Sequence, residues 1–270
     1  MVQGIDVSTY QGRIVWSRVK AAGIAFAFAR ISDGTTAPDP EFEENWTAMK
    51  EAGVIRGSYQ YFRASEDVLG QVGLVVAGLN DAGGLLPGDL PVVMDIETAD
   101  NQSNAAVRQA MTVWLGAVAA GTGKPPIIYT NSAMSSVLGP GFGDYALWIA
   151  DWAESCPTTP NGWSTWRFWQ YSDLGSVSGV GARVDLDEFD GPLSALMAFA
   201  NGGPGAESPD GAGVSQADAA TDAVDTTGDA TVGQERDASS NAGDVATPTA
   251  AASVGPADAG TTSATKRCAP

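Results

Sequence analysis

The sequence predicts an α/β protein: an irregular (β/α) barrel of the TIM type with fewer helices than strands, followed by a disordered tail. Three observations predict this fold class. Short apolar segments alternate with segments of helical periodicity, which is typical of a parallel sheet covered by helices. The strand-like segments number eight, which suggests that the sheet closes into a barrel. From residue 201 to the end there is no aromatic residue, so no second apolar core is expected there.

The eight strands are predicted from apolar runs bounded by turn residues. The first begins almost at the start of the chain, and the second alternates large and small residues. The later strands have little helix between them. In chain order, the predicted strands cover residues 2–7, 24–31, 54–62, 90–97, 126–130, 145–152, 166–171 and 182–186.

Four helices are predicted between the first five strands. Residues 15–22 carry apolar side chains at helical spacing, and Gly23 fits a helix end. The pair Asp39-Pro40 is a good helix start, and that helix closes at Gly53. A third helix is capped by residues 65–67 and runs to about residue 80, and a fourth extends from about residue 107 to 121.

Two carboxylates directly follow the apolar run of residues 90–94. Asp95 and Glu97 stand at positions i and i+2, so on a strand their side chains share one face, roughly 6–7 Å apart along the chain. Two carboxylates this close in a partly dry site do not both ionise easily, so one should have a raised pKa. A protonated acid beside a charged one is what glycosidic bond cleavage uses. For so short a pattern, a solvated strand end or an oxygen-rich metal site remains an alternative.

Charge and composition exclude several classes of function. Lys and Arg total 14 against 32 Asp and Glu, a net charge of −18, whereas a nucleic-acid-binding protein needs a basic surface. The absence of histidine removes Ser-His-Asp and Cys-His catalysis and the usual zinc ligand. Any hydrolytic chemistry must therefore rest on carboxylates. No apolar run is long enough to span a membrane.

Residues 201–270 form a separate compositional region. They include ten acidic and three basic residues, which leaves residues 1–200 with a net charge of −11. Such a segment cannot bury enough apolar surface to offset the entropy of ordering it. We therefore divide the chain into a barrel, residues 1–200, and a disordered acidic tail, residues 201–270, for which a wall-associated spacer is the alternative. One disulfide between Cys156 and Cys268 is possible and would join the two regions.

An ordered set of short motifs resembles the lysozymes of glycoside hydrolase family 25, the N-acetylmuramidases. The resemblance covers about residues 3–191, and Asp95-Ile96-Glu97 is similar to the signature pair of that family. The other matching motifs, in order, are Gly4-Ile5-Asp6-Val7-Ser8 with Tyr10-Gln11-Gly12, Phe28-Ala29-Arg30, Asp39 with Phe42 and Asn45, Gly57-Ser58-Tyr59-Gln60-Tyr61-Phe62-Arg63, Ile128-Tyr129-Thr130, Leu147-Trp148-Ile149-Ala150, Trp169-Gln170-Tyr171 and Val184-Asp185-Leu186-Asp187.

Three positions depart from the family pattern. Arg30 stands where lysine is usual, which keeps the charge but changes the geometry. Gln60 stands where histidine is frequent. Asp187 stands where asparagine is common, so we take Asp185 as the equivalent acid, although the two could be confused.

The resemblance implies a substrate and a role for each of four acids. The substrate is the β-1,4 bond between N-acetylmuramic acid and N-acetylglucosamine in peptidoglycan. Glu97 is assigned as the general acid and base. Asp95 would orient the substrate's own 2-acetamido group as that group attacks the sugar carbon, with a direct nucleophilic role as the rival. Asp6 and Asp185, on the first and last strands, would hold the pair and separate its pKa values.

Six further residues are candidates for substrate binding. Sugars stack on aromatic faces, although buried aromatic residues are also common in barrels. Arg63 could meet a carboxylate of the lactyl or peptide group, but a protein acid is its favoured partner. The candidates are Tyr59, Tyr61, Tyr129, Trp148, Gln170 and Arg63.

Three other functions stay open: a chitin-degrading enzyme, an inactive wall-binding module and a divalent-metal enzyme. A crowded carboxylate set argues against the binding module. We expect no cofactor, no metal, no nucleic-acid partner and a monomer acting on glycan strands. An extracellular or wall-associated place is expected, although no basic and apolar signal segment opens the chain, so either a leader has been removed or export uses another route.

Overall fold

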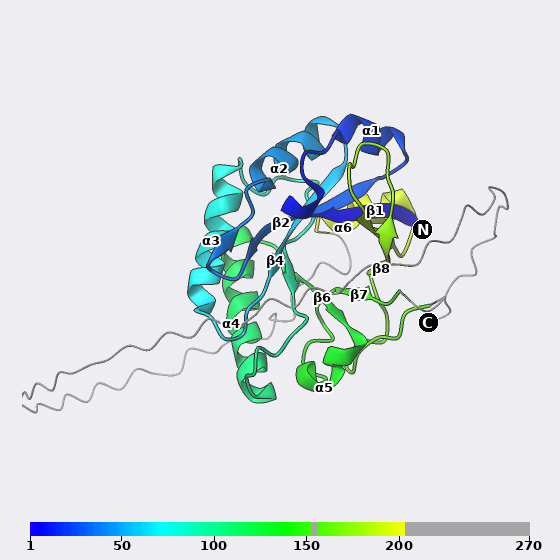
Figure 1. The fold of residues 1–270 in the computed structure, drawn as a ribbon. Helices are drawn as coiled ribbons and strands as arrows, with labels where there is room; N and C mark the ends of the chain where they lie inside the picture. Colours follow the sequence, from blue (N-terminus) through cyan, green and yellow to red (C-terminus); the bar gives the residue numbers. More distant parts are fainter. Residues whose placement is uncertain (153–155, 203–270) are drawn as a thin grey trace, which may run out of the picture. The chain divides into compact units, whose positions relative to one another are not determined.

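The protein is described here from a computed structural model in which residues 1–152 and 156–202 are placed (Figure 1). These residues belong to one compact unit. They contain nine strands in a single sheet: β1 (Val2–Val7), β2 (Phe26–Asp33), β3 (Ala37–Pro38), β4 (Ile55–Tyr61), β5 (Val93–Asp95), β6 (Ile127–Asn131), β7 (Leu147–Ala150), β8 (Phe168–Gly175) and β9 (Val184–Phe189). Six α-helices accompany them in the same residues: α1 (Trp16–Ala21), α2 (Phe42–Glu51), α3 (Val68–Asp81), α4 (Asn104–Thr122), α5 (Ser135–Leu138) and α6 (Leu193–Ala200).

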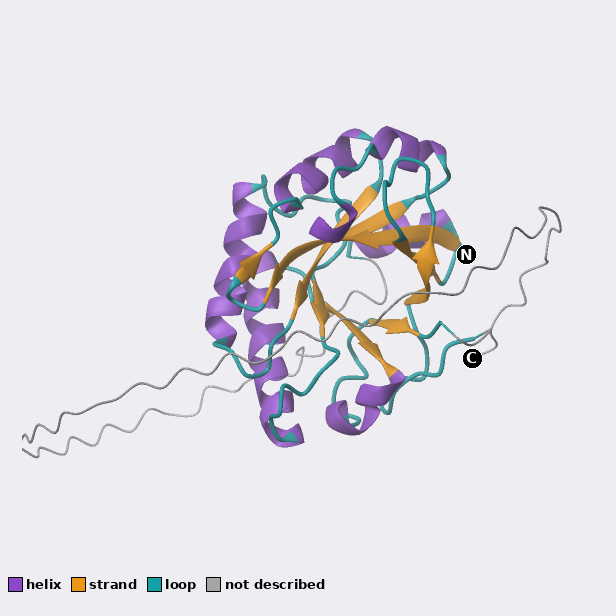
Figure 2. Cartoon of the chain, viewed as in Figure 1, coloured by secondary structure: helices purple, strands orange, loops and turns teal. Residues whose placement is uncertain are grey.

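Eight of the strands close into a barrel, which confirms the predicted fold class. The sheet order runs β1-β9-β8-β7-β6-β5-β4-β2, and an additional pairing of β1 with β2 completes the circle. The short strand β3 pairs only with β2, outside the circle. Figure 2 shows the strands at the centre, with helices α1 to α4 following one side of the barrel.

One barrel strand departs from the parallel arrangement that we expected. Strands β1, β2 and β4 to β8 run parallel to one another around the barrel, but β9 runs antiparallel to both β1 and β8. The short strand β3, outside the barrel, is also antiparallel to β2. Only residues 176–183 separate β8 from β9. A parallel return needs a crossover of a dozen or more residues, so this connection permits only a hairpin.

The barrel interior is filled by aromatic side chains. Phe26 and Phe28 of β2 point inward, and Phe28 stacks on Trp148 with ring centroids 4.5 Å apart. Their alternating partners, Ala27 and Ala29, face the helices, where small side chains let the helices approach. A Cβ atom at Gly4 or Gly57 would overlap these phenylalanine rings, so glycine is required beside them.

Helix α6 covers the barrel end where the strands begin. Its Leu196 and Phe199 join the inner aromatic cluster. The Nζ of Lys124, which precedes β6, donates to the last helical carbonyl, Ala200 O, at 2.7 Å and to Asp89 O at 2.6 Å. The opposite end of the barrel, where the parallel strands end, is not covered by α6 and can hold a functional site.

The sequence-based prediction located most elements within a few residues and missed two helices. α1 to α4 lie close to their predicted places, and α3 and α4 are capped by Asp67 and Ser103. α5 and α6 were not predicted, and β9 lies slightly later than residues 182–186. Among the placed residues, no helix has both the length and the apolar character needed to cross a lipid bilayer. Residues 203–270, which include most of the predicted tail and Cys268, lie outside the described residues.

Candidate active site

All ten residues predicted for the site line one cavity of about 420 Å³. It opens where the parallel strands end, because Asp6, Tyr59, Asp95 and Tyr129 stand at or near the last residues of their strands. The reversed direction of β9 brings its beginning to the same place. The ten are Asp6, Tyr59, Tyr61, Arg63, Asp95, Glu97, Tyr129, Trp148, Gln170 and Asp185.

Asp95 and Glu97 differ in their exposure. Asp95 ends β5 and is only 5 % exposed, whereas Glu97, two residues later, is exposed to solvent. The two carboxyl groups interact by a hydrogen bond. Burial, followed by the charge of Glu97, raises the pKa of Asp95 well above its usual value. Although the residue as a whole is exposed, partial burial of its carboxyl group raises the pKa of Glu97, while its hydrogen bond with Asp95 and the charge of Arg63 act in the opposite direction.

One oxygen of this pair receives no hydrogen bond from a permanent donor. Asp95 Oδ1 is buried, and no N–H or hydroxyl group of the described residues donates to it. A buried carboxylate oxygen without a donor is costly. This atom is therefore prepared to hold a proton or to accept an N–H from a bound molecule.

Three more carboxyl groups, Asp6, Asp185 and Asp187, lie beside the pair. Asp6 of β1 is aligned with Asp185 of β9 in the antiparallel register. Burial, then the charges of Asp187 and Asp185, raise the pKa of Asp6 well above its usual value. Burial and the charge of Asp173 raise the pKa of Asp185 to about 6. These groups increase the negative potential around Asp95.

Gln170 of β8 connects the acids to the aromatic wall. Its Nε2 donates to Asp6 Oδ2 at 2.7 Å. Its Oε1 accepts from the hydroxyl of Tyr129 at 2.9 Å and from Nε1 of Trp152 at 3.0 Å. Two donors on the oxygen fix the orientation of the amide, so Asp6 Oδ2 must be an acceptor.

The four predicted aromatic residues are buried or half-buried, so they form the wall and floor of the cavity and not its solvent-exposed rim. Trp148 and Tyr129 are 1 % and 6 % exposed and pack edge-on against each other. Tyr59 contacts Trp148 from β4. Burial, followed by the charges of Asp6 and Asp95, raises the pKa of Tyr59 well above its usual value, so its hydroxyl stays protonated.

Both cationic side chains of the cavity are already paired with protein acids. Arg63 donates Nε and Nη2 to Asp33 at 2.6 and 2.8 Å and lies over the ring of Tyr61. Arg30 donates Nε to Asp39 Oδ2 at 3.0 Å. The departure at Gln60 lies away from the cavity: this buried amide accepts from Trp114 Nε1 and donates to Ser32 Oγ.

The structure adds residues that the sequence reasoning did not select. Tyr10 and Trp152 line the cavity and are 78 % and 55 % exposed, so they offer the most open aromatic faces. Asp33 and Asp173 add acids to the wall. Tyr10 lies within one of the matching motifs. Trp152 is the last residue of the strand predicted over residues 145–152, so its position at a strand end was a usable signal.

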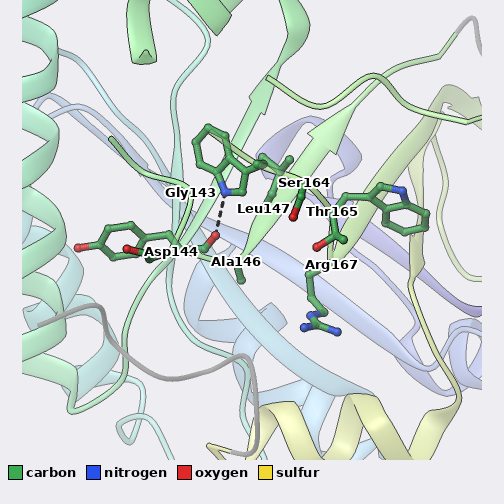
Figure 3. A pocket seen from close by; sticks show the side chains of 10 residues that line it. Gly143, Asp144, Ala146, Leu147, Ser164, Thr165 and Arg167 are labelled. Carbon is green, nitrogen blue, oxygen red and sulfur yellow. Dashed lines mark hydrogen bonds between the residues drawn. The ribbon is translucent and has the colours of Figure 1, made fainter. Parts of the chain in front are cut away.

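A second, smaller cavity of about 140 Å³ lies where β7 and β8 begin (Figure 3). Its lining includes Asp144, Ser164, Thr165 and Arg167, and the Trp163 Nε1 donates to the backbone oxygen of Tyr145 at 2.8 Å. It holds none of the predicted site residues and has no pair of neighbouring carboxylates.

Comparisons with known proteins agree with the geometry. Residues 5–180 match the profile of the family described as glycosyl hydrolases family 25. The chain is 36% identical over 219 residues to lysozyme M1 of Streptomyces globisporus, covering 74% of this chain and 71% of the relative. It is 35% identical over 207 residues to the uncharacterized protein YegX of Escherichia coli K12, covering 74% of each chain. The crystal structure of a bacterial lysozyme from Streptomyces coelicolor superposes with a TM-score of 0.70 at 35% identity, covering 74% of this chain and 97% of that chain.

Proposed function

Because this chain belongs to the family 25 glycosyl hydrolases, we propose that it is an N-acetylmuramidase that cleaves the β-1,4 bond between N-acetylmuramic acid and N-acetylglucosamine. The family implies peptidoglycan as the substrate. The observation that carries the proposal is the buried Asp95 hydrogen-bonded to the exposed Glu97, in a cavity at the strand ends.

In this proposal, Glu97 is the general acid and base. It stands at the open side of the pair, where a glycosidic oxygen can reach it, and its pKa is raised. It protonates the leaving oxygen and then removes a proton from the attacking water. Arg63 and the hydrogen bond with Asp95 lower the pKa of Glu97, so that it can also return to the carboxylate form.

Asp95 orients the 2-acetamido group of the bound sugar. The unpaired Oδ1 of Asp95 supplies an acceptor for the acetamido N–H. The acetamido oxygen then attacks the anomeric carbon as the bond to the leaving oxygen breaks, and water opens the resulting ring with retention of configuration. Substrate assistance is a known exception to the two-carboxylate scheme. In the rival scheme, Asp95 attacks directly and forms a covalent glycosyl ester, which mass spectrometry would detect.

The proton of the pair changes place when substrate binds. In the empty cavity Asp95 holds it, because Asp95 is the more deeply buried of the two acids. An acetamido N–H at Asp95 Oδ1 favours the ionised form of Asp95. A bound sugar also removes water from Glu97 and favours its neutral form. The proton therefore passes along the existing hydrogen bond to Glu97, which is then ready to act as the acid.

The first prediction concerns Glu97. Release of reducing ends from purified peptidoglycan should fall at least 100-fold in Glu97→Gln, because an amide cannot donate its proton to the leaving oxygen. Glu44→Gln, on the exposed face of α2, is the matched control and should keep the parent's rate. Chemical identification of the new sugar ends should give muramic acid.

Other outcomes point to the alternative functions. A folded parent that releases nothing from peptidoglycan but cleaves chitin would move the substrate to that polymer. A folded parent that binds walls without cutting either polymer would be a binding module. Loss of activity with a chelator, and its return with a divalent cation, would make the acids metal ligands instead.

The place of action follows from the substrate. We propose that the protein works outside the membrane, on the cell wall. Fractionation of the producing cells would then find it in the medium or on the wall, and its confinement to the cytoplasm would contradict this.

A further inference from the structure

Asp187 lies beneath the active-site cavity without lining it. It is fully buried on β9, beside Asp185 and Asp6. Its Oδ1 accepts a hydrogen bond from Trp148 Nε1 at 2.9 Å. Its Oδ2 is buried and receives no hydrogen bond from an N–H or hydroxyl group of any described residue. The proposed mechanism gives Asp187 no role.

The neighbouring Asp6 has a similar environment. It is 5 % exposed, and its carboxyl group lies within hydrogen-bonding reach of Asp187 and Asp185. Among the placed residues, no ion pair includes any of these three acids. Two adjacent carboxylates in a barrel interior, both ionised and without a cation, would repel each other and lose their hydration.

The hydrogen-bond directions show where a proton can reside. Gln170 donates to Asp6 Oδ2, and its own amide orientation is fixed by Tyr129 and Trp152. A proton on Asp6 therefore belongs on its other oxygen, Oδ1. Trp148 occupies Asp187 Oδ1, which leaves Oδ2 as the acceptor. Asp6 Oδ1 can therefore carry the proton that Asp187 Oδ2 accepts.

We propose that Asp187 is a positioning residue that holds one proton with Asp6, and that this shared proton keeps Asp6 and Gln170 in place in the cavity lining. The pair then carries one negative charge instead of two. Through Gln170 it also fixes the hydroxyl of Tyr129 and the indole of Trp152. The shared proton is independent of the proposed function, and only its effect on turnover rests on that function.

Other titratable groups surround the pair. Asp185 and Asp173 stand on β9 and β8, Asp95 and Glu97 on and just after β5, and Tyr59, Tyr129 and Tyr171 on β4, β6 and β8. The pKa values of all three tyrosines are raised, chiefly by burial, so they stay neutral. Arg30 faces Asp95 and Tyr59. Ionisation of the remaining acids as pH rises adds repulsion, which favours retention of the shared proton.

The test is the isosteric substitution Asp187→Asn, followed by unfolding in guanidinium from pH 5 to pH 9. The parent holds a proton that the unfolded chain releases, so its stability falls as pH rises through this range. An asparagine amide donates permanently to Asp6 and needs no proton. We expect the variant to release about one proton fewer than the parent on unfolding. For each pH unit, the equilibrium constant for unfolding should therefore rise in the parent by about ten times the factor by which it rises in the variant.

A second readout detects the proton itself. Infrared difference spectra of parent minus Asp187→Asn should contain the carbonyl stretch of a protonated carboxyl group. On peptidoglycan, the variant should stay active to higher pH than the parent, because its pair cannot become doubly charged. Asp187→Ala also removes the second acid but offers Asp6 no donor, so it should be less stable than Asp187→Asn throughout this pH range.

Every other result overturns the proposal. Equal pH slopes in the two proteins, or no carboxyl band, would mean that Asp6 and Asp187 hold no shared proton. A variant that fails to fold would mean that an amide cannot replace the proton. Both stability readouts work even if the protein cleaves no peptidoglycan, so failure of the proposed function would be seen separately.

Discussion

At the scale of single residues, Trp152 offers an open aromatic face beside the catalytic acids. It is 55 % exposed, and Nε1 at its inner edge donates to Gln170. The floor residues Trp148 and Tyr129 are covered by other rings. A sugar ring that enters the cavity can therefore stack on Trp152 more readily than on the floor.

Trp152→Ala should raise KM for soluble peptidoglycan fragments by roughly three- to tenfold with a smaller effect on kcat, because a stacking contact contributes about 0.5–1.5 kcal/mol. Steady-state kinetics on defined fragments would measure this. Trp152→Phe keeps an aromatic face but loses the N–H, so it serves as the control and should stay close to the parent. Equal losses in both variants would assign the effect to the Gln170 hydrogen bond.

The residues of the site were largely predictable from sequence, as were a raised pKa in the Asp95 and Glu97 pair and a protein acid as the partner of Arg63. The identity of most hydrogen-bond partners was not predictable. Asp95 and Glu97 emerged from the i, i+2 spacing and the family resemblance, and the cavity contains both. The pairing of Arg63 with Asp33 joins residues 30 apart in sequence. The contact of Asp187 with Asp6 depends on barrel closure across 181 residues. Such contacts depend on tertiary structure, which local patterns do not encode.

At the scale of elements, the helices between the early strands were predictable because each has a periodic apolar face and a cap. α3 begins after Asp67, whose side chain accepts from Leu69 N, and α4 begins after Ser103. The antiparallel direction of β9 was not predicted, although the connection before it, residues 176–183, is too short for the crossover that a parallel strand needs. α6 was missed because its eight residues stand next to the region of changed composition.

The capping of α6 by Lys124 leads to a stability prediction. Lys124→Met should lower the free energy of unfolding by about 1–3 kcal/mol, because it removes two charge-assisted hydrogen bonds to the carbonyls of Ala200 and Asp89. Denaturant unfolding at neutral pH would measure the change. Lys20→Met, on the exposed side of α1, is the matched control and should have little effect. A loss below about 0.3 kcal/mol would show that these bonds exchange freely with water.

At the scale of the whole molecule, charge opposes approach to the wall. Residues 1–200 have a net charge of −11, and cell walls with their attached polymers are anionic. Repulsion between the two is screened within about 8–10 Å at moderate salt.

Hydrolysis of intact walls should therefore rise from very low to moderate ionic strength. Turbidity clearing of purified walls across a salt series would measure it, and a short uncharged glycan fragment would serve as the control with a flat profile. A flat or falling profile on intact walls would remove long-range repulsion as a factor.

The closure of the barrel by β9 also has a consequence for the order of events during synthesis. A nascent chain that ends before Val184 contains Asp6, Asp95 and Glu97 but lacks the strand that pairs with β1 and β8. Both of those strands then have an open edge, the kind that invites pairing with other chains. The cluster of carboxylates in and beside the cavity is also incomplete, because Asp185 and Asp187 belong to β9. Synthesis of β9 therefore completes the site and the barrel at the same time. A chain that ends before β9 contains both catalytic acids but cannot form the closed barrel.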